Sequence, residues 1–353
     1  MSRWCTASLT TVDPPGRHTL AGMSDAIEHT GPALVVTRHG GREVLAVEER
    51  TAPAPGAGTV LVEVAAAGVN FIDVYQREGV YPVPTPFVSG NEGAGTVVAV
   101  GPDVTGVRVG ERVAWPQTMA SAARYAAVPA TDLVPVPDTV DLETAAAVML
   151  QGLTAHYLTT STYAVAPGDV ALVHAAAGGV GQLLVQMVHA RGGSVVATAG
   201  GPEKCATARD LGAEHVIDYR AVDDLAAEVR ARTGGRGVDV AYDGVGKDTF
   251  DASLASLRRR GTLALFGGAS GQVPPVDLQR LNAGGSLFVT RPKLLDHITT
   301  RDELEWRARE VLGAVADGSL TVAIGGRYPL TDAATAYADL EGRRTRGKLI
   351  LLP

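Results

Sequence analysis

Residues 170–181 read Val-Ala-Leu-Val-His-Ala-Ala-Ala-Gly-Gly-Val-Gly, an apolar run followed by a glycine-rich turn. A continuous apolar run is typical of a strand covered on both faces, as in a parallel sheet. The amphipathic stretch 182–190 indicates a helix after the turn, and Gly192 and Gly193 end it. Glycines at such a turn let the backbone approach a pyrophosphate at the positive end of the helix. The order predicts a nicotinamide dinucleotide site, with an ordinary strand–helix turn as the alternative.

The choice of dinucleotide depends on the residues after the second strand, predicted at 194–198. Proteins that select NAD place Asp or Glu about 20 residues past the glycines, on the ribose 2′-hydroxyl. Residues 199–202 read Ala-Gly-Gly-Pro and carry no carboxylate, and Lys204 follows, where its ammonium can meet a 2′-phosphate. Glu203 is interpreted as a solvated helix start. The sequence therefore favours NADPH.

The composition is that of a soluble globular protein with room for two domains. The 353 residues are 46% apolar and 20% charged, with a net charge of −7, which gives no electrostatic footprint for nucleic acid or an anionic membrane. No apolar stretch approaches the roughly 20 residues that span a bilayer. Two cysteines, Cys5 and Cys205, are too few for a disulfide framework and fit a reducing compartment. We therefore expect a cytoplasmic protein without nucleic-acid or membrane partners.

The pattern divides the chain into two kinds of segment. Residues 33–128 hold short strands between Gly and Pro turns and predict a compact β-barrel-like domain. Residues 144–285 alternate strands and helices and predict a doubly wound parallel sheet. The individual elements expected are strands at 59–64, 95–100, 112–115, 238–242, 262–266, 287–290 and 348–352, and a helix at 302–316.

Several motifs resemble one known superfamily. Segments 68–73 (Gly-Val-Asn-Phe-Ile-Asp), 91–95 (Asn-Glu-Gly-Ala-Gly) and 110–113 (Gly-Glu-Arg-Val) fall in the order of the medium-chain dehydrogenases/reductases. Segments 70–75, 174–181 and 289–292 are similar to the zinc-independent quinone oxidoreductase, or ζ-crystallin-like, branch. The resemblance runs from about residue 32 to residue 353. It implies an α/β fold in which a Rossmann-type doubly wound sheet is clasped by a GroES-like β-rich catalytic domain.

That resemblance also gives the expected boundaries. Residues 29–145 and 290–353 form the GroES-like domain, and residues 146–289 form the Rossmann NADPH-binding domain. Residues 1–28 are expected to be a disordered N-terminal extension without a secretory h-region.

No zinc is expected. A catalytic zinc needs about three ligands from Cys, His and carboxylates. Zinc-dependent relatives carry Cys at the place of Asn70 and His at the place of Asn91, and amides are poor zinc ligands. The stretch 116–124 lacks the cysteines of a structural zinc lobe. His174, after an apolar strand, is interpreted as a hydrogen-bonded core residue.

The resemblance implies roles for individual side chains. Asn70 and Thr154 lie near the nicotinamide, and Tyr75 and Tyr81 line the acceptor pocket, so Asn70, Tyr75 and Tyr81 are the catalytic candidates. A half-buried loop tyrosine is the alternative for Tyr81. The remaining cofactor candidates are Ala176, Ala177, Gly178, Gly179, Val180, Gly181, Thr198, Lys204, Tyr219, Val245, Phe266, Gly267, Gly268, Phe288, Arg291 and Arg343.

Two of these positions carry reservations. Close relatives often carry Asn at the place of Gly268, and its absence removes a hydrogen bond to the cofactor. Arg343 and Arg344 can instead form a solvated helix end.

The sequence predicts an NADPH-dependent, zinc-free reductase of quinones or related conjugated carbonyls. The alternatives are an enoyl or enone reductase, and an NADPH-binding protein without turnover. The apolar strand at 286–290 ends the Rossmann half, and an uncovered edge of this kind invites pairing with a second copy. Because relatives commonly dimerise there, a homodimer is expected, unless Phe288 faces the core of its own domain.

Overall fold

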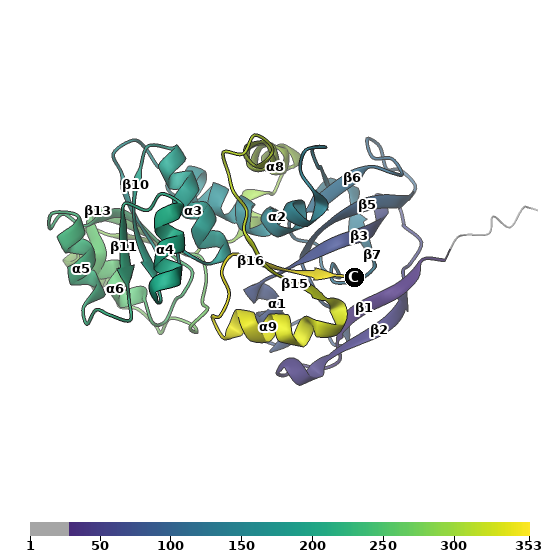
Figure 1. Cartoon of the computed structure of the whole chain (residues 1–353), viewed down its shortest axis with the longest axis horizontal. Coiled ribbons are helices and arrows are strands. Elements are labelled where there is room, and N and C mark those ends of the chain that lie inside the picture. Colours follow the sequence, from purple (N-terminus) through teal and green to yellow (C-terminus); the bar gives the residue numbers. More distant parts are fainter. Residues whose placement is uncertain (1–27) are drawn as a thin grey trace, which may run out of the picture.

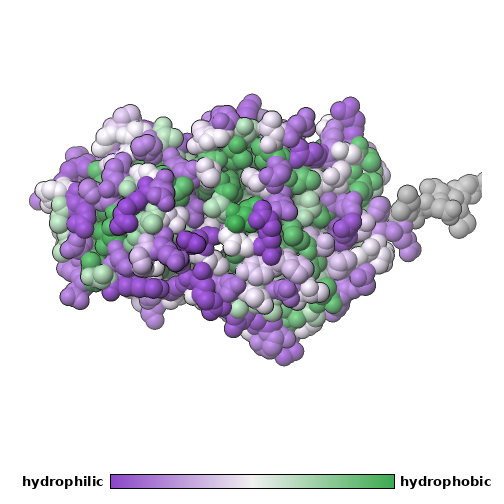
Figure 2. Space-filling model, in the orientation of Figure 1, coloured by the Kyte–Doolittle hydropathy of each residue, from purple (hydrophilic) through white to green (hydrophobic). Residues whose placement is uncertain are grey.

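The computed structural model describes residues 28–353, so the expected extension at 1–28 lies outside the described residues apart from Glu28. Two sheet regions lie at opposite ends of an elongated molecule, with α2 (Leu142–Tyr157) between them (Figure 1). Hydrophilic residues cover much of the face in Figure 2, and apolar residues form separate groups. In the described part of the chain, no helix is long and apolar enough to cross a membrane.

One region is built on a six-stranded parallel sheet. Its strand order is β11-β10-β9-β12-β13-β14. The chain enters the sheet in the middle, at β9, adds β10 and β11 on one side, and then crosses to add β12, β13 and β14 on the other side, so the order of the strands reverses between β9 and β12. Ligands of such sheets bind at this reversal, beyond the carboxyl ends of the strands. The strands are β9 (Val170–Val173), β10 (Ser194–Ala199), β11 (His215–Asp218), β12 (Val238–Asp243), β13 (Leu257–Leu265) and β14 (Phe288–Thr290).

Helices connect these strands as the alternating sequence pattern predicts. Their apolar residues, such as Leu184 and Val188 of α3, are buried against the sheet, while the exposed side is polar. The helices are α3 (Gly179–Ala190), α4 (Pro202–Asp210), α5 (Leu225–Arg232), α6 (Phe250–Ser256) and α7 (Gln279–Ala283).

The other region is β-rich. A seven-stranded sheet has the order β15-β16-β3-β5-β6-β8 with β7 also on β3, and a three-stranded sheet has the order β2-β1-β4. Its strands are β1 (Thr30–Val36), β2 (Leu45–Thr51), β3 (Thr59–Val69), β4 (Phe87–Val88), β5 (Glu92–Val100), β6 (Arg112–Trp115), β7 (Tyr125–Pro129), β8 (Val134–Pro135), β15 (Ile324–Pro329) and β16 (Lys348–Leu352). Because β16 pairs antiparallel with β3 (Leu349 opposite Val69), the end of the chain completes a sheet begun near its start.

Helix α2 joins the two regions. Its alanine-rich faces are buried on several sides, and it packs against α3, α8 (Arg301–Ala316), β3 and β5. One core cluster therefore runs from Ala66 and Ala94 in the β-rich sheets to Val173 in the parallel sheet. The other helical segments are α1 (Phe71–Arg77), α9 (Ala333–Glu341), the π-helical turn η3 (Leu158–Thr162), and the short turns η1 (Arg42–Val44), η2 (Ala130–Asp132), η4 (Leu294–His297) and η5 (Leu330–Asp332).

The observed bounds correct some predicted ones. The strand predicted at 262–266 is β13, which begins at Leu257 and ends at Leu265, so Phe266 lies just beyond it. The early start was missed because the polar run 258–261 (Arg-Arg-Arg-Gly) interrupts the apolar pattern after Leu257. The pairing of β13 with β12 also shifts register over this run. The helix predicted at 302–316 begins at Arg301 because Thr300 and Glu303 form a capping box.

Candidate active site

The glycine turn lies where the sequence predicts, between β9 and α3. Gly181 packs so closely on the Ala175 carbonyl that a Cβ has no room, whereas a Cβ on Gly179 would meet the amide end of the Gln151 side chain. A Cβ on Gly178 would meet only the Ala175 oxygen, at 3.1 Å, and the Gly178 backbone forms an isolated bridge with Gly347. The first N–H groups of α3 have no acceptor within the helix and suit an anion. This part of the chain fits the pyrophosphate of a dinucleotide.

Beyond β10, several positively charged side chains lie near one another. Lys204 is half-buried on α4, and its Nζ donates to the Arg343 carbonyl oxygen at 2.6 Å. Burial lowers the pKa of Lys204, and so do the positive charges of Arg220, Arg346 and Arg343. Four cations therefore converge at the end of β10, where the sequence places no carboxylate. Such a group favours a phosphate over a plain hydroxyl.

Arg220 is a candidate that the sequence reasoning missed. Its Nε would be 3.0 Å from a Cβ on Gly200, and the Tyr219 hydroxyl would be 2.6 Å from that Cβ. Both side chains thus lie against the turn that follows β10. The strand order could have predicted this position. Tyr219 and Arg220 follow β11, and the carboxyl ends of neighbouring parallel strands such as β10 and β11 meet at one edge of the sheet.

The segment between α9 and β16 crosses this edge of the parallel sheet. The Gly347 N–H donates to the Ala177 carbonyl at 3.1 Å. Arg343 is 3.8 Å from Asp248, and Arg346 is 3.6 Å from Glu203. Arg343 therefore lies at this edge of the parallel sheet, whereas Arg344 pairs with Asp339 at 2.9 Å on the side of α9.

A second group of candidates lies on the loops after β12 and β13. The Asp243 carboxylate accepts from the N–H groups of Val245 and Gly246 at 2.9 and 3.0 Å and so fixes the turn after β12. Phe266 lies against Gly244, and the Gly267 N–H donates to the Asp243 carbonyl at 3.3 Å. A Cβ on Gly268 would be 3.7 Å from the Tyr75 hydroxyl. The loops bring Val245, Phe266, Gly267 and Gly268 to one edge.

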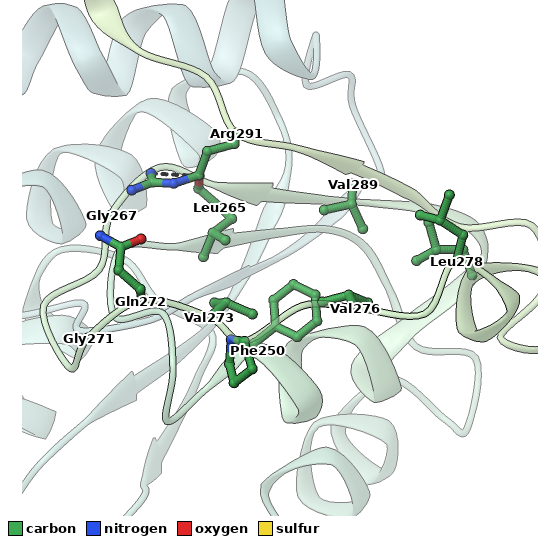
Figure 3. Close-up of a pocket in the computed structure, with 12 residues that line it drawn as sticks. Phe250, Leu265, Gly267, Gly271, Gln272, Val273, Val276, Leu278, Val289 and Arg291 are labelled. Carbon is green, nitrogen blue, oxygen red and sulfur yellow. Dashed lines mark hydrogen bonds between the residues drawn. The ribbon is translucent and has the colours of Figure 1, made fainter.

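Arg291 stands at the mouth of an apolar pocket beside these loops. Its Nη1 donates to the Leu265 carbonyl at 3.0 Å (Figure 3). The pocket has a volume of about 330 Å³, and Gly267 and Val289 are among its lining residues. Arg291 thus borders the nucleotide edge and an apolar hollow at the same time.

Asn70 lies at the N-terminus of α1 inside a buried polar network. Its Nδ2 donates to Glu92 Oε1 at 2.7 Å and to the Gly68 carbonyl at 3.3 Å. Its Oδ1 accepts from Lys348 Nζ at 2.7 Å and from Gln151 Nε2 at 3.3 Å. Lys348 and Glu92 are 2% and 0% exposed and form an ion pair, so their charges compensate each other inside the protein.

Asp73 links Asn70 to Asn91. Its carboxylate accepts from the Asn70 backbone N–H at 2.8 Å and from Asn91 Nδ2 at 2.6 Å. Burial raises the pKa of Asp73 to about 6, against the lowering effect of these hydrogen bonds. The two asparagines thus lie in one network, although no group of three or more His, Cys, Asp or Glu residues in 28–353 is arranged to hold a metal ion.

Tyr75 and Tyr81 form an aromatic pair facing the loop of Gly268. Their ring centroids are 5.3 Å apart in an edge-to-face arrangement, and Tyr81 is 39% exposed. Burial raises the pKa of the Tyr75 hydroxyl, so it stays protonated and able to donate at neutral pH. Thr154, on α2, is 7% exposed and lies one turn from Gln151.

Two predicted cofactor residues lie within strands and not on the loops beyond them. Thr198 is 1% exposed, and its hydroxyl is 3.0 Å from His174 Nδ1, so the side chain is already used within the core. His174, whose Nε2 is 2.9 Å from the Ser253 hydroxyl, is the hydrogen-bonded core residue that the sequence predicts. Phe288 is 60% exposed at the start of the edge strand β14, opposite Thr262 of β13, three residues before β13 ends at Leu265. The structure places Phe288 within the outermost strand and not on the loops that follow the strands.

Comparisons with known proteins agree with this geometry. Residues 56–138 match a family model described as an alcohol dehydrogenase GroES-like domain, and residues 179–307 match one described as a zinc-binding dehydrogenase. A quinone oxidoreductase of Salmonella typhimurium is 44% identical over 320 residues, covering 90% of this chain and 98% of the relative. The chain belongs to the quinone oxidoreductase branch of the medium-chain dehydrogenases/reductases.

Two further relatives refine this family placement. A mycobacterial protein solved with NADPH is 50% identical, with a TM-score of 0.89 over 92% of this chain and all of that chain. A 2-haloacrylate reductase of a Burkholderia species is 41% identical over 329 residues, covering 91% of this chain and 98% of the relative. As a member of this branch, the chain is an oxidoreductase that combines a Rossmann-type sheet with a GroES-like domain.

Proposed function

We propose that this protein is an NADPH-dependent quinone oxidoreductase that works without zinc. The observation that carries the proposal is the group of Lys204, Arg220, Arg343 and Arg346 around the turn after β10, whose own residues 199–202 carry no carboxylate. Asp218, opposite Ala199 on β11, is engaged by the Arg220 backbone N–H at 3.0 Å. The mycobacterial relative solved with NADPH supports this choice of cofactor.

The chain's own residues bind and orient the two reactants. NADPH supplies a hydride when bound, and the glycine turn with the N-terminus of α3 holds its pyrophosphate. Tyr75 and Tyr81 line the acceptor side, where their ring faces stack on a flat quinone. The protonated Tyr75 hydroxyl donates a hydrogen bond to the acceptor oxygen on which negative charge develops.

Zinc independence rests on the side chains at Asn70 and Asn91. Their amides are bonded to Glu92, Lys348, Asp73 and Gln76. A buried lysine ammonium beside Asn70 also repels a divalent cation. A quinone accepts hydride without the Lewis acid that a simple alcohol dehydrogenation requires.

Reduction of a conjugated carbon–carbon double bond is the second candidate. The specific observation in its favour is the 41% identity with a 2-haloacrylate reductase. Quinones and enones share a conjugated carbonyl, so the same hydrogen-bond donor serves both.

We also propose that two copies associate through β14. Phe288 and Val289 are 60% and 39% exposed on this strand, which lies at the end of the strand order. The exposure of Phe288 argues against the alternative that it faces its own core. An unpaired edge strand with exposed apolar side chains invites a partner strand, and a two-fold axis can supply the same strand.

The low cysteine content supports a cytoplasmic location.

The decisive experiment compares acceptors under one set of conditions. NADPH oxidation is followed with a panel of quinones, a panel of enones including a 2-haloacrylate, and with NADH in place of NADPH. We expect turnover with quinones and a higher kcat/KM with NADPH than with NADH. Turnover with enones alone would establish the second candidate, and nucleotide binding without any turnover would establish a non-catalytic NADPH-binding protein.

A further inference from the structure

A second hollow lies at the opposite edge of the parallel sheet, where its strands begin. It has a volume of about 900 Å³ and is lined from the starts of β9, β12 and β13 and from the turns that follow α5 and α7. Helix α5 stands at the end of the molecule away from the β-rich region (Figure 1). This cavity is therefore separate from the nucleotide edge, which lies beyond the carboxyl ends of the same strands.

The charge of the cavity is opposite to that of the chain. Five arginines and two aspartates line it, a formal excess of three positive charges, whereas the whole chain carries −7. These lining residues are Arg230, Arg236, Arg258, Arg259, Arg260, Asp169 and Asp239.

Three of the arginines have structural partners. Arg230 donates to the carbonyl oxygens of Ala255 and Leu257 at 2.8 and 2.9 Å. Arg236 and Arg258 share the single carboxylate of Asp239.

The other two guanidinium groups are unengaged. Within residues 28–353, the side chains of Arg259 and Arg260 make neither a hydrogen bond nor an ion pair, and both residues are exposed. The cavity thus presents two free guanidinium groups beside two that share one negative charge.

The backbone is distorted where these arginines lie. In a regular strand, successive side chains point to opposite faces, yet Arg258, Arg259 and Arg260 all line this cavity. The pairing of β13 with β12 jumps from Leu257 to Thr262, and Arg260 has a φ of 59°, in the left-handed region that favours glycine. A bulge of this kind re-aims side chains, and strain at a residue that is not glycine is typical of functional positions.

We propose that this cavity binds a phosphorylated small molecule, with Arg259 and Arg260 holding its phosphate oxygens. The planar guanidinium fork matches phosphate oxygens with two parallel hydrogen bonds. A small ligand fits better than a nucleic acid or a membrane surface, because an extended polyanion would also meet the negative charge of the surrounding protein. This inference does not depend on the proposed quinone reductase activity.

The test uses inorganic pyrophosphate as the probe and the full chain saturated with NADPH. Saturation fills the nucleotide edge, so pyrophosphate can bind only elsewhere, and a constant ionic strength holds the screening constant. Isothermal titration calorimetry should show one saturable site in the wild type. The double variant Arg259→Ala/Arg260→Gly should bind at least tenfold more weakly, and glycine at position 260 suits the left-handed backbone.

A matched control removes the same charge elsewhere. Arg209→Ala/Arg309→Ala changes two exposed arginines on α4 and α8, outside the cavity, and should bind pyrophosphate like the wild type. All proteins should keep the wild-type affinity for NADPH, which verifies their fold. If the double variant does not fold, Arg259→Ala alone should weaken pyrophosphate binding at least threefold.

Three results would overturn the proposal. They are the absence of saturable pyrophosphate binding by the wild type, unchanged binding by the cavity variant, and an equal loss in the control variant, which would indicate diffuse charge attraction. Binding of an RNA oligomer without binding of pyrophosphate would also overturn it.

Discussion

If the Lys204 ammonium contacts the 2′-phosphate, replacement of Lys204 by alanine should weaken the binding of NADPH but not that of NADH. A hydrogen bond to a charged group contributes about 1.5–3 kcal/mol. Lys204 is half-buried, and Arg220, Arg343 and Arg346 remain around the phosphate, so we expect the lower part of this range. About 1.5–2 kcal/mol corresponds to a roughly 10–30-fold weaker affinity for NADPH.

NADH lacks the 2′-phosphate, so its affinity should stay within about twofold of the wild-type value. The assay is a fluorescence titration of each protein with NADPH and with NADH, paired with kcat/KM for both cofactors and one quinone. Arg209→Ala on the same helix is the matched control, because it removes an exposed positive charge away from the turn after β10. Equal losses for NADPH and NADH, or a loss in the control as large as in Lys204→Ala, would refute the assignment.

Four other outcomes are expected. Because Asn70 and Asn91 present amides, which are poor zinc ligands, the protein should hold well below one zinc per chain by elemental analysis, and a chelator should leave its activity unchanged. Stoichiometric zinc would contradict this expectation. A Cβ at position 268 would be 3.4 Å from the Gly271 carbonyl oxygen and 3.7 Å from the Tyr75 hydroxyl, so Gly268→Asn has room for its side chain. One added hydrogen bond should tighten NADPH binding by about 0.5–1.5 kcal/mol in the same fluorescence titration. Weaker binding would show that the loop is not a cofactor contact. Phe288→Lys should convert a dimer to a folded monomer by light scattering and circular dichroism, and a wild-type monomer at micromolar concentration would contradict the dimer. Burial raises the pKa of Asp73 from 3.8 to about 6, so the protonated carboxyl stabilises the folded state below pH 4, and this contribution is lost as the pH rises through 6. Relative to Asp73→Asn, the wild type should therefore lose about 3 kcal/mol of unfolding free energy between pH 4 and pH 6 in urea titrations. A difference between the two proteins that does not change with pH would contradict the raised pKa.

Local sequence patterns predicted the parallel sheet well, because each of its strands and helices is encoded by one continuous stretch of sequence. The apolar run before the glycine turn, the strand at 194–198 and the helix after the turn correspond to β9, β10 and α3. Glycine positions carried the same information, since Gly181 packs too closely on the Ala175 backbone to hold a side chain.

The buried polar network was beyond local reasoning. Asn70, Glu92 and Lys348 come from the end of β3, the start of β5 and the start of β16, and only the pairing of β16 with β3 brings them together. Lys348 carried no signal in the sequence, because a lysine at the start of a strand is normally exposed. Arg220 was missed for a related reason, since its role depends on the adjacency of β10 and β11 rather than on a motif.

The hydrogen bonds of Asn70 bear on how the cofactor enters the site. An asparagine side chain offers two donor hydrogens and two acceptor lone pairs, and here Glu92, Gly68, Lys348 and Gln151 use all four. A direct contact of this amide with nicotinamide therefore requires one of these bonds to break. The bonds to charged groups are short, at 2.7 Å, whereas those to Gly68 and Gln151 are 3.3 Å long. The Oε1 of Gln151 is buried without a donor in the described part of the chain, and the side chain also abuts Gly179 at the glycine turn. Gln151 thus links Asn70 to the glycine turn through its side chain, and its hydrogen bond to Asn70 is one of the two long ones.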